Sequence, residues 1–186
     1  EVEVRVAANR GTARTFTVAG HHYALVVVDG LEPGVSVPYE VFLDAAPAWP
    51  DPTSPFPPSR IRTVDPARPI RILFGSCREP PTVRPNAREL DPDIFDAFAN
   101  RMMSREHGAW PDILLLVGDQ VYADDTSPAI RQFIRSRRNI RKPPKAEVAN
   151  FEEYTRLYYE SWGEPTVRWL LSTLPSAMIF DDHDVH

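Results

Sequence analysis

The stretch ILLLVGD at residues 113–119 decides the fold, because five apolar residues run without interruption into a glycine and an aspartate. Such a run is typical of a strand with both faces covered. Shorter apolar runs at residues 70–74 and 177–180 lie before and after it, and residues 94–102 and 151–173 carry apolar side chains at helical spacing. Strands alternating with helices predict an α/β domain with a parallel sheet.

Residues able to bind a metal follow all three expected strands. Ligands bind at the carboxyl ends of the strands in open α/β sheets, and these ends lie side by side when the strands pair in parallel. Each group alone is more often a helix cap, a solvated loop or a small buried cysteine. Together they indicate a site, and its candidates are Cys77, Asp119, Tyr122, Asp124, Asp125, Asp181, Asp182, His183 and Asp184.

Residues 1–64 carry the patterns of short β-strands. Val2, Val4 and Val6 alternate with polar residues, and strands are also expected at residues 14–18, 23–28, 37–43 and 60–64. This predicts an N-terminal β-sandwich over residues 1–64, followed by the α/β domain over residues 65–186. Within the sandwich, the proline-rich residues 45–58 are expected to form an extended connection.

The segment around Leu31, Pro33 and Gly34 resembles the E–F corner of a fibronectin type III domain. Val37 stands where that family places its corner tyrosine. The resemblance implies a sandwich of the fibronectin III or immunoglobulin type.

Composition excludes several classes of protein. The chain has 186 residues and a formal net charge of -5, and no apolar run approaches the ~20 residues that span a bilayer. Its single cysteine cannot form an internal disulfide. One segment is basic and contains Arg131, Arg135, Arg137, Arg138, Arg141, Lys142 and Lys145. The favoured interpretation is a solvated helix face and loop, and the alternative is an electrostatic funnel for anionic substrates. The segment lacks the interleaved aromatic residues of nucleic-acid-binding proteins.

Three sequence blocks resemble the signatures of the PhoD-like (alkaline phosphatase D) family, in the family's order. They read FGSCR at residues 74–78, GDQVYAD at residues 118–124 and FDDHDV at residues 180–185. The family belongs to the calcineurin-like metallophosphoesterases. The resemblance implies an α/β domain with two β-sheets flanked by helices, of which residues 65–186 form the first part.

The resemblance also implies a set of metal ligands. Asp119 matches an aspartate that bridges two metals, and its two oxygens suit that position. Cys77 and Tyr122 match the ligands of a ferric ion, which can hold a thiolate and a phenolate near neutral pH. The second metal is expected to be Ca²⁺, with Asp182 as its ligand and Asp181 as the runner-up.

Two further residues are candidates for contact with the phosphate. His183 is expected to act as a hydrogen-bond donor or general acid, with a structural histidine as the alternative. Arg78 directly follows Cys77 and could bind phosphate with two hydrogen bonds, with an ion pair as the equally favoured alternative.

The expected function is hydrolysis of small-molecule phosphate mono- or diesters by a metal-activated hydroxide. Further ligands are expected from later strands, so residues 1–186 alone are expected to be inactive. A non-catalytic binding protein is the main alternative. A covalent hydrolase using Cys77 and His183 is disfavoured because nearby carboxylates raise a thiol pKa. Export to the cell envelope or secretion follows from the resemblance alone, and a cytoplasmic location stays open.

Overall fold

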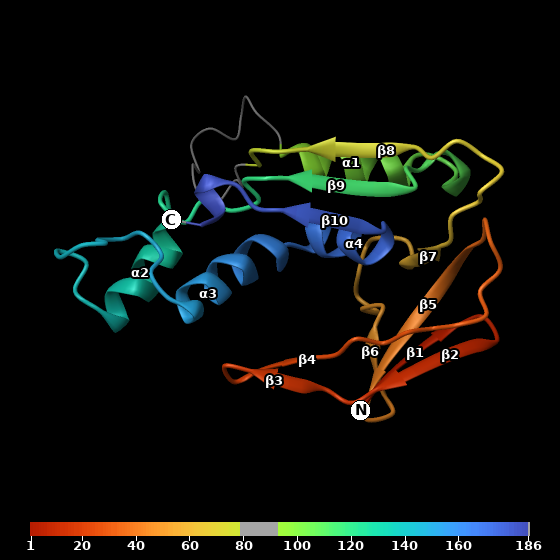
Figure 1. Ribbon diagram of the computed structural model, residues 1–186, viewed down its shortest axis with the longest axis horizontal. Coiled ribbons are helices and arrows are strands. Elements are labelled where there is room, and N and C mark those ends of the chain that lie inside the picture. Colours follow the sequence, from red (N-terminus) through yellow and green to blue (C-terminus); the bar gives the residue numbers. More distant parts are fainter. Residues whose placement is uncertain (79–92, 186) are drawn as a thin grey trace.

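Figure 1 shows a computed structural model of the chain, which describes residues 1–78 and 93–185. The N-terminal part is antiparallel β structure, and the C-terminal part is a parallel sheet with helices packed against it. This confirms a β-rich region followed by an α/β region. Within the described residues, no helix is long and apolar enough to cross a membrane.

The N-terminal sheet has the strand order β2-β1-β5-β6, with β7 paired to the other end of β5. A separate hairpin contains β3 and β4. The expected strands near residues 1–6, 37–43 and 60–64 are present, and the one at 14–18 is present in part as β3. The strand expected at residues 23–28 is wrong, because residues 24–28 are not in a strand, and β2 was not predicted. The fibronectin III type of sandwich stays a prediction. The strands are β1 Val2–Val6, β2 Asn9–Ala13, β3 Phe16–Val18, β4 His21–Tyr23, β5 Ser36–Leu43, β6 Ala46–Trp49 and β7 Arg60–Arg62.

The expected connection over residues 45–58 is wrong in its first part, because Ala46–Trp49 is a strand paired with β5. Asp44 and Ala45 take left-handed backbone angles, with φ 46° and 67°. Two such residues form the tight turn that matches the twist of a hairpin. Further on, the carbonyl of Pro57 accepts a hydrogen bond from the Trp169 indole at 2.8 Å, so the proline-rich segment packs against α4 (Pro165–Thr173).

The α/β part is built on three parallel strands in the order β10-β9-β8. These are β8 Ile72–Gly75, β9 Ile113–Val117 and β10 Ser176–Ile179. Helices α1 (Ile94–Met103) and α4 lie on one face (Figure 1). The core between them contains Ala99, Met102, Trp110, Leu114, Leu116, Trp169, Leu170 and Leu174.

Helix α1 begins at Ile94, and Asp93 is its N-cap. The Asp93 carboxylate accepts a hydrogen bond from the backbone N–H of Phe95 at 2.7 Å. Asp91 and Pro92, residue types that also suit a cap and a first helical position, lie outside the described residues. A short 3-10 turn, η1 (His107–Ala109), leads into β9.

The other face of the parallel sheet is apolar and exposed among the described residues. Phe74 is 72% exposed and Ile179 is 60% exposed, and Ile72 and Val117 lie on the same face. The expectation that β9 is covered on both faces is therefore not met within this part of the chain.

A second apolar cluster supports the segment that follows β9. It joins that segment to α2 (Pro128–Arg137) and α3 (Phe151–Trp162), whose N-caps are Ser127 and Asn150. The cluster contains Val121, Ala123, Ile130, Ile134, Val148 and Leu157.

Most of the basic residues between positions 131 and 145 are exposed, as the solvated-face interpretation predicts.

Arg138 differs from the other basic residues because it forms a buried ion pair. Its Nε lies 2.8 Å from Oε1 of Glu153, which is fully buried. Burial acts to raise the pKa of Glu153, but hydrogen bonds from Arg138 and the backbone of Ala149 outweigh it, so the pKa lies below its ordinary value. The ionised pair therefore stabilises the fold above the ordinary pKa of 4.5, and this contribution is lost as the pH falls through the lowered pKa.

We expect Glu153→Gln to lower the free energy of unfolding by about 1–3 kcal/mol near pH 7. The difference from wild type should shrink as the pH falls through the lowered pKa of Glu153, because the glutamate itself then becomes protonated. Urea denaturation over a series of pH values from neutral to acidic measures this. Glu160→Gln on the same helix is the control, and equal losses in both variants would contradict the role of the Arg138–Glu153 pair.

Candidate metal centre

The site lies where the three parallel strands end. Two backbone hydrogen bonds continue the pairing of β8 and β9 beyond their last residues, from Cys77 N–H to Gly118 O at 3.2 Å and from Arg78 N–H to Asp119 O at 3.1 Å. Cys77 and Asp119 both have left-handed backbone angles, with φ 55° and 53°. Such angles are uncommon outside glycine and cluster at functional sites.

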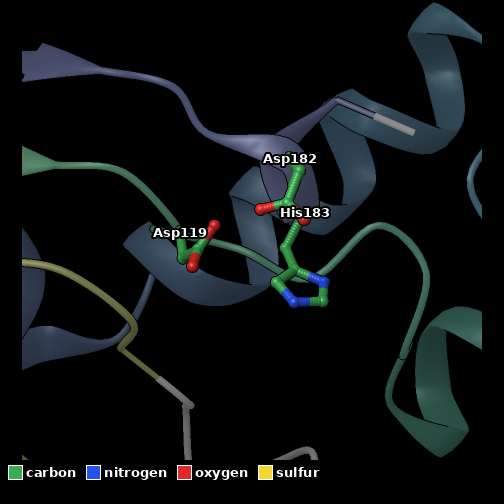
Figure 2. A group of neighbouring side chains, drawn as sticks. All are labelled: Asp119, Asp182 and His183. Atoms are coloured by element: carbon green, nitrogen blue, oxygen red, sulfur yellow. The ribbon is translucent and has the colours of Figure 1, made fainter.

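Asp119, Asp182 and His183 form one group (Figure 2). Each offers a potential ligand atom, and these atoms lie within 4.8 Å of one another. Asp119 comes from the end of β9, whereas Asp182 and His183 belong to the 3-10 turn η2 (Asp182–Asp184) that follows β10. Oδ2 of Asp119 also lies 3.2 Å from Sγ of Cys77. Asp119 therefore contacts a thiol and also belongs to the group with Asp182 and His183.

The residues of this group are suited to bind a metal ion, and the surroundings of one carboxylate oxygen of Asp119 support this. Its side chain is buried, and Oδ1 has no hydrogen-bond partner among the described residues. A buried carboxylate oxygen without a partner is costly, and a bound cation would satisfy it. Carboxylate, thiolate and imidazole ligands suit iron and other transition metals, and carboxylates also suit Ca²⁺.

His183 is oriented by Asp124. Its Nδ1 lies 2.8 Å from both carboxylate oxygens of Asp124. A carboxylate only accepts hydrogen bonds, so Nδ1 carries the proton and Nε2 is the other ring nitrogen. The hydrogen bond to Asp124 raises the pKa of His183, with smaller contributions from the charges of Asp124, Asp182 and Asp119. The sequence indicates Asp124 as a candidate site residue but not its pairing with His183, because the two residues are 59 positions apart.

Tyr122 and Asp181 lie beside the group in different ways. The Tyr122 ring packs 4.7 Å from the His183 ring, measured between centroids. Asp181 is the N-cap of η2, and its Oδ1 accepts a hydrogen bond from the backbone N–H of Asp182 at 2.9 Å. The structure thus brings Asp182 into the group with Asp119, and leaves Asp181 as a cap.

Comparison with known proteins identifies the family. Residues 86–186, more than half of the chain, match the sequence profile of the PhoD-like phosphatases. The chain belongs to the PhoD-like phosphatase family. The resemblance inferred from its three blocks is confirmed.

Two further findings concern the rest of this PhoD-like chain. Residues 1–61 match a family described as a domain of unknown function, DUF7800. A solved structure titled "Structure of PhoD" has a TM-score of 0.62 and 18% sequence identity to the chain. The match covers 100% of this chain and 32% of that one, and at this identity it shows the fold alone. No curated protein gave a significant match.

Arg78 of this PhoD-like chain is engaged in a buried network. Its Nη2 lies 2.7 Å from Oδ2 of Asp93 and 3.0 Å from Oε2 of Glu164, and Nη1 donates to Ser161 Oγ at 2.8 Å. The side chain is only 7% exposed. Burial raises the pKa of Glu164, and the charge of Arg78 acts in the opposite direction. The phosphate-binding role of Arg78 stays a prediction, and it competes with these hydrogen bonds.

The network and the phosphate role predict different effects of Arg78→Ala. Leaving Asp93 and Glu164 without their buried partner should lower the free energy of unfolding by about 3–5 kcal/mol. Arg131→Ala, which breaks an exposed pair with Asp125, should cost no more than about 1 kcal/mol. Chemical denaturation of both variants tests this. Wild-type stability of Arg78→Ala together with a raised KM for a phosphate ester would instead favour the phosphate role.

Proposed function

We propose that the protein containing this chain hydrolyses phosphate esters at a metal centre built around Asp119. One observation carries the proposal. Asp119 presents a buried oxygen that lacks a hydrogen bond within the described residues, and its other oxygen lies 3.2 Å from the Cys77 sulfur. Membership of the PhoD-like phosphatases supports the same reaction class.

The ligands are proposed to divide into two sets that share Asp119. Cys77, Tyr122 and Asp119 would hold Fe³⁺, and Asp119 and Asp182 would hold Ca²⁺. The contact between Cys77 and Asp119 supports the first set, and the group that joins Asp119 to Asp182 supports the second. When bound, the metals would lower the pKa of water and neutralise charge on the phosphoryl group.

The remaining chemistry falls to His183 and Asp124. Asp124 holds the Nδ1 proton of the imidazole, so the doubly protonated ring would have Nε2 as the nitrogen that donates a hydrogen bond or a proton to the ester. Protonating the leaving oxygen as its bond to phosphorus breaks removes the charge that develops there. The raised pKa of His183 supports this role because it favours the protonated ring.

The proposed substrates are small-molecule phosphate mono- or diesters, and the proposed location is the cell envelope or outside the cell. We also propose that a second β-sheet covers the apolar face of β8, β9 and β10, as in the metallophosphoesterase fold. The exposure of Phe74 and Ile179 on that face supports it. Residues outside this chain would then supply the further metal ligands.

Substitution separates a ligand from a proton donor. In the intact protein, Asp119→Asn should lose both bound metal and activity, because it removes a charge shared by two metals. His183→Ala should keep its metals and lose about 10²–10⁴-fold in turnover. The loss should be smaller for a nitrophenyl ester, whose leaving group needs little protonation. Metal analysis and turnover with good and poor leaving groups measure both effects.

Two outcomes would reassign His183. If His183→Ala loses its metals as Asp119→Asn does, the imidazole is a ligand. If it keeps its metals and full turnover on the poor leaving group, His183 is a structural residue. A metal-free wild-type protein whose activity depends on a reactive Cys77 would support the covalent hydrolase instead.

The proposed Fe³⁺ site predicts a visible absorption band. A thiolate and a phenolate bound to ferric iron transfer charge to the metal, so the intact protein should be coloured. Tyr122→Phe should shift or bleach the band. A colourless, iron-free wild-type protein with full activity would refute both Cys77 and Tyr122 as iron ligands.

A further inference from the structure

Asp184 is a buried carboxylate that none of the proposed ligand sets uses. The residue is 1% exposed and lies in η2, directly after His183. Its oxygens accept four backbone hydrogen bonds from two segments. Oδ2 accepts from Asp119 N–H at 2.6 Å and Asp181 N–H at 3.0 Å, and Oδ1 accepts from Gln120 N–H at 2.9 Å and Val121 N–H at 3.1 Å.

The phenol of Tyr158, on α3, lies close to Asp184 and is neutral beside it. Burial first, and then the charge of Asp184, raise the pKa of Tyr158 to about 12. With four N–H groups directed at it, the Asp184 carboxylate is occupied within the protein. It is therefore unsuited to bind a metal directly.

Three of the four N–H groups belong to the segment that carries Asp119. Consecutive backbone N–H groups that converge on one anion form a nest, which needs unusual backbone angles. The left-handed φ of 53° at Asp119 is one of them. A non-glycine residue keeps such an angle only when its surroundings fix it. The Asp184 carboxylate supplies that constraint, and it determines the direction in which the Asp119 side chain leaves the backbone.

The same carboxylate also fixes the second half of the site. Asp184 belongs to the same turn as Asp182 and His183, and it closes that turn through a capping box with Asp181. One side chain thus holds the backbone after β9 and the backbone after β10 at a set distance. Asp119 and Asp182 lie 63 positions apart in the sequence, and this contact links the two backbone segments that carry them.

We propose that Asp184 is the positioning residue of the metal centre, which sets Asp119 against Asp182 and His183 through backbone amides. This inference rests on the proposed function. Residues that orient metal ligands from outside the coordination sphere typically contribute 10–100-fold to metal affinity. A residue that only stabilises the fold would change the unfolding free energy and leave the metal's coordination as it was.

The test uses Co²⁺ binding to the intact protein after removal of its native metals with a chelator. Asp184→Asn keeps the shape of the side chain but places an NH₂ group against the N–H groups of the nest. We expect it to bind Co²⁺ about 10–100-fold more weakly than wild type, with a shifted visible spectrum. Asp44→Asn is the matched control, because it makes the same substitution at an exposed carboxylate in the turn before β6, outside the site. It should bind Co²⁺ within about 2-fold of wild type.

Each result decides a different question. Wild-type affinity and spectrum in Asp184→Asn would overturn the positioning role and leave the proposed function standing. A wild-type protein that binds no Co²⁺ would refute the proposed function itself. If Asp184→Asn does not fold, hydrogen exchange on the wild-type protein replaces it. Slow exchange of the Gln120 and Val121 amides is expected, and exchange as fast as in exposed loops would overturn the inference.

Discussion

The parallel pairing of β9 with a neighbour on each side is the constraint on which the site depends. Because both pairs run in parallel, the residues after β8, β9 and β10 emerge at one edge of the sheet. The hydrogen bonds from Cys77 and Arg78 to the segment after β9 carry this alignment past the strands. Cys77, Asp119 and Asp182 come from three segments of the chain and meet because of it.

Bringing so many carboxylates to one edge creates a repulsion that the fold must offset. Backbone N–H groups surround the carboxylate of Asp184, and the imidazole of His183 pairs with Asp124. Asp119 differs, because one of its buried oxygens has no such partner in the described part of the chain. The fold thus supplies hydrogen-bond donors to Asp184 and Asp124 and leaves one oxygen of Asp119 without a donor among the described residues. That contrast is typical of a place where a cation binds rather than of a solvated acidic loop.

The sequence predicted those parts of the molecule that depend on local pattern. The run Ile113–Val117 and the helix Phe151–Trp162 were placed correctly, because continuous apolar residues and helical spacing are strong signals. Asp119 and Asp182 were predicted to belong to one site because both follow strands that were expected to pair in parallel. The role of Asp184 was missed, because a carboxylate that accepts hydrogen bonds from residues 63–65 positions away leaves no local pattern. Strand β6 was missed because its turn contains Asp44 and Ala45 instead of the usual glycine.

The ion pair between Arg78 and Asp93 has a consequence for how this fold can vary. The pair joins the two ends of residues 79–92, since its partners are 15 positions apart. Arg78 directly follows Cys77, and Asp93 caps α1, so the pair ties the end of β8 to the start of that helix. A change at either residue would leave a buried charge without its partner and act on the strand end and the helix start together. Related chains should therefore replace the two residues jointly or keep both.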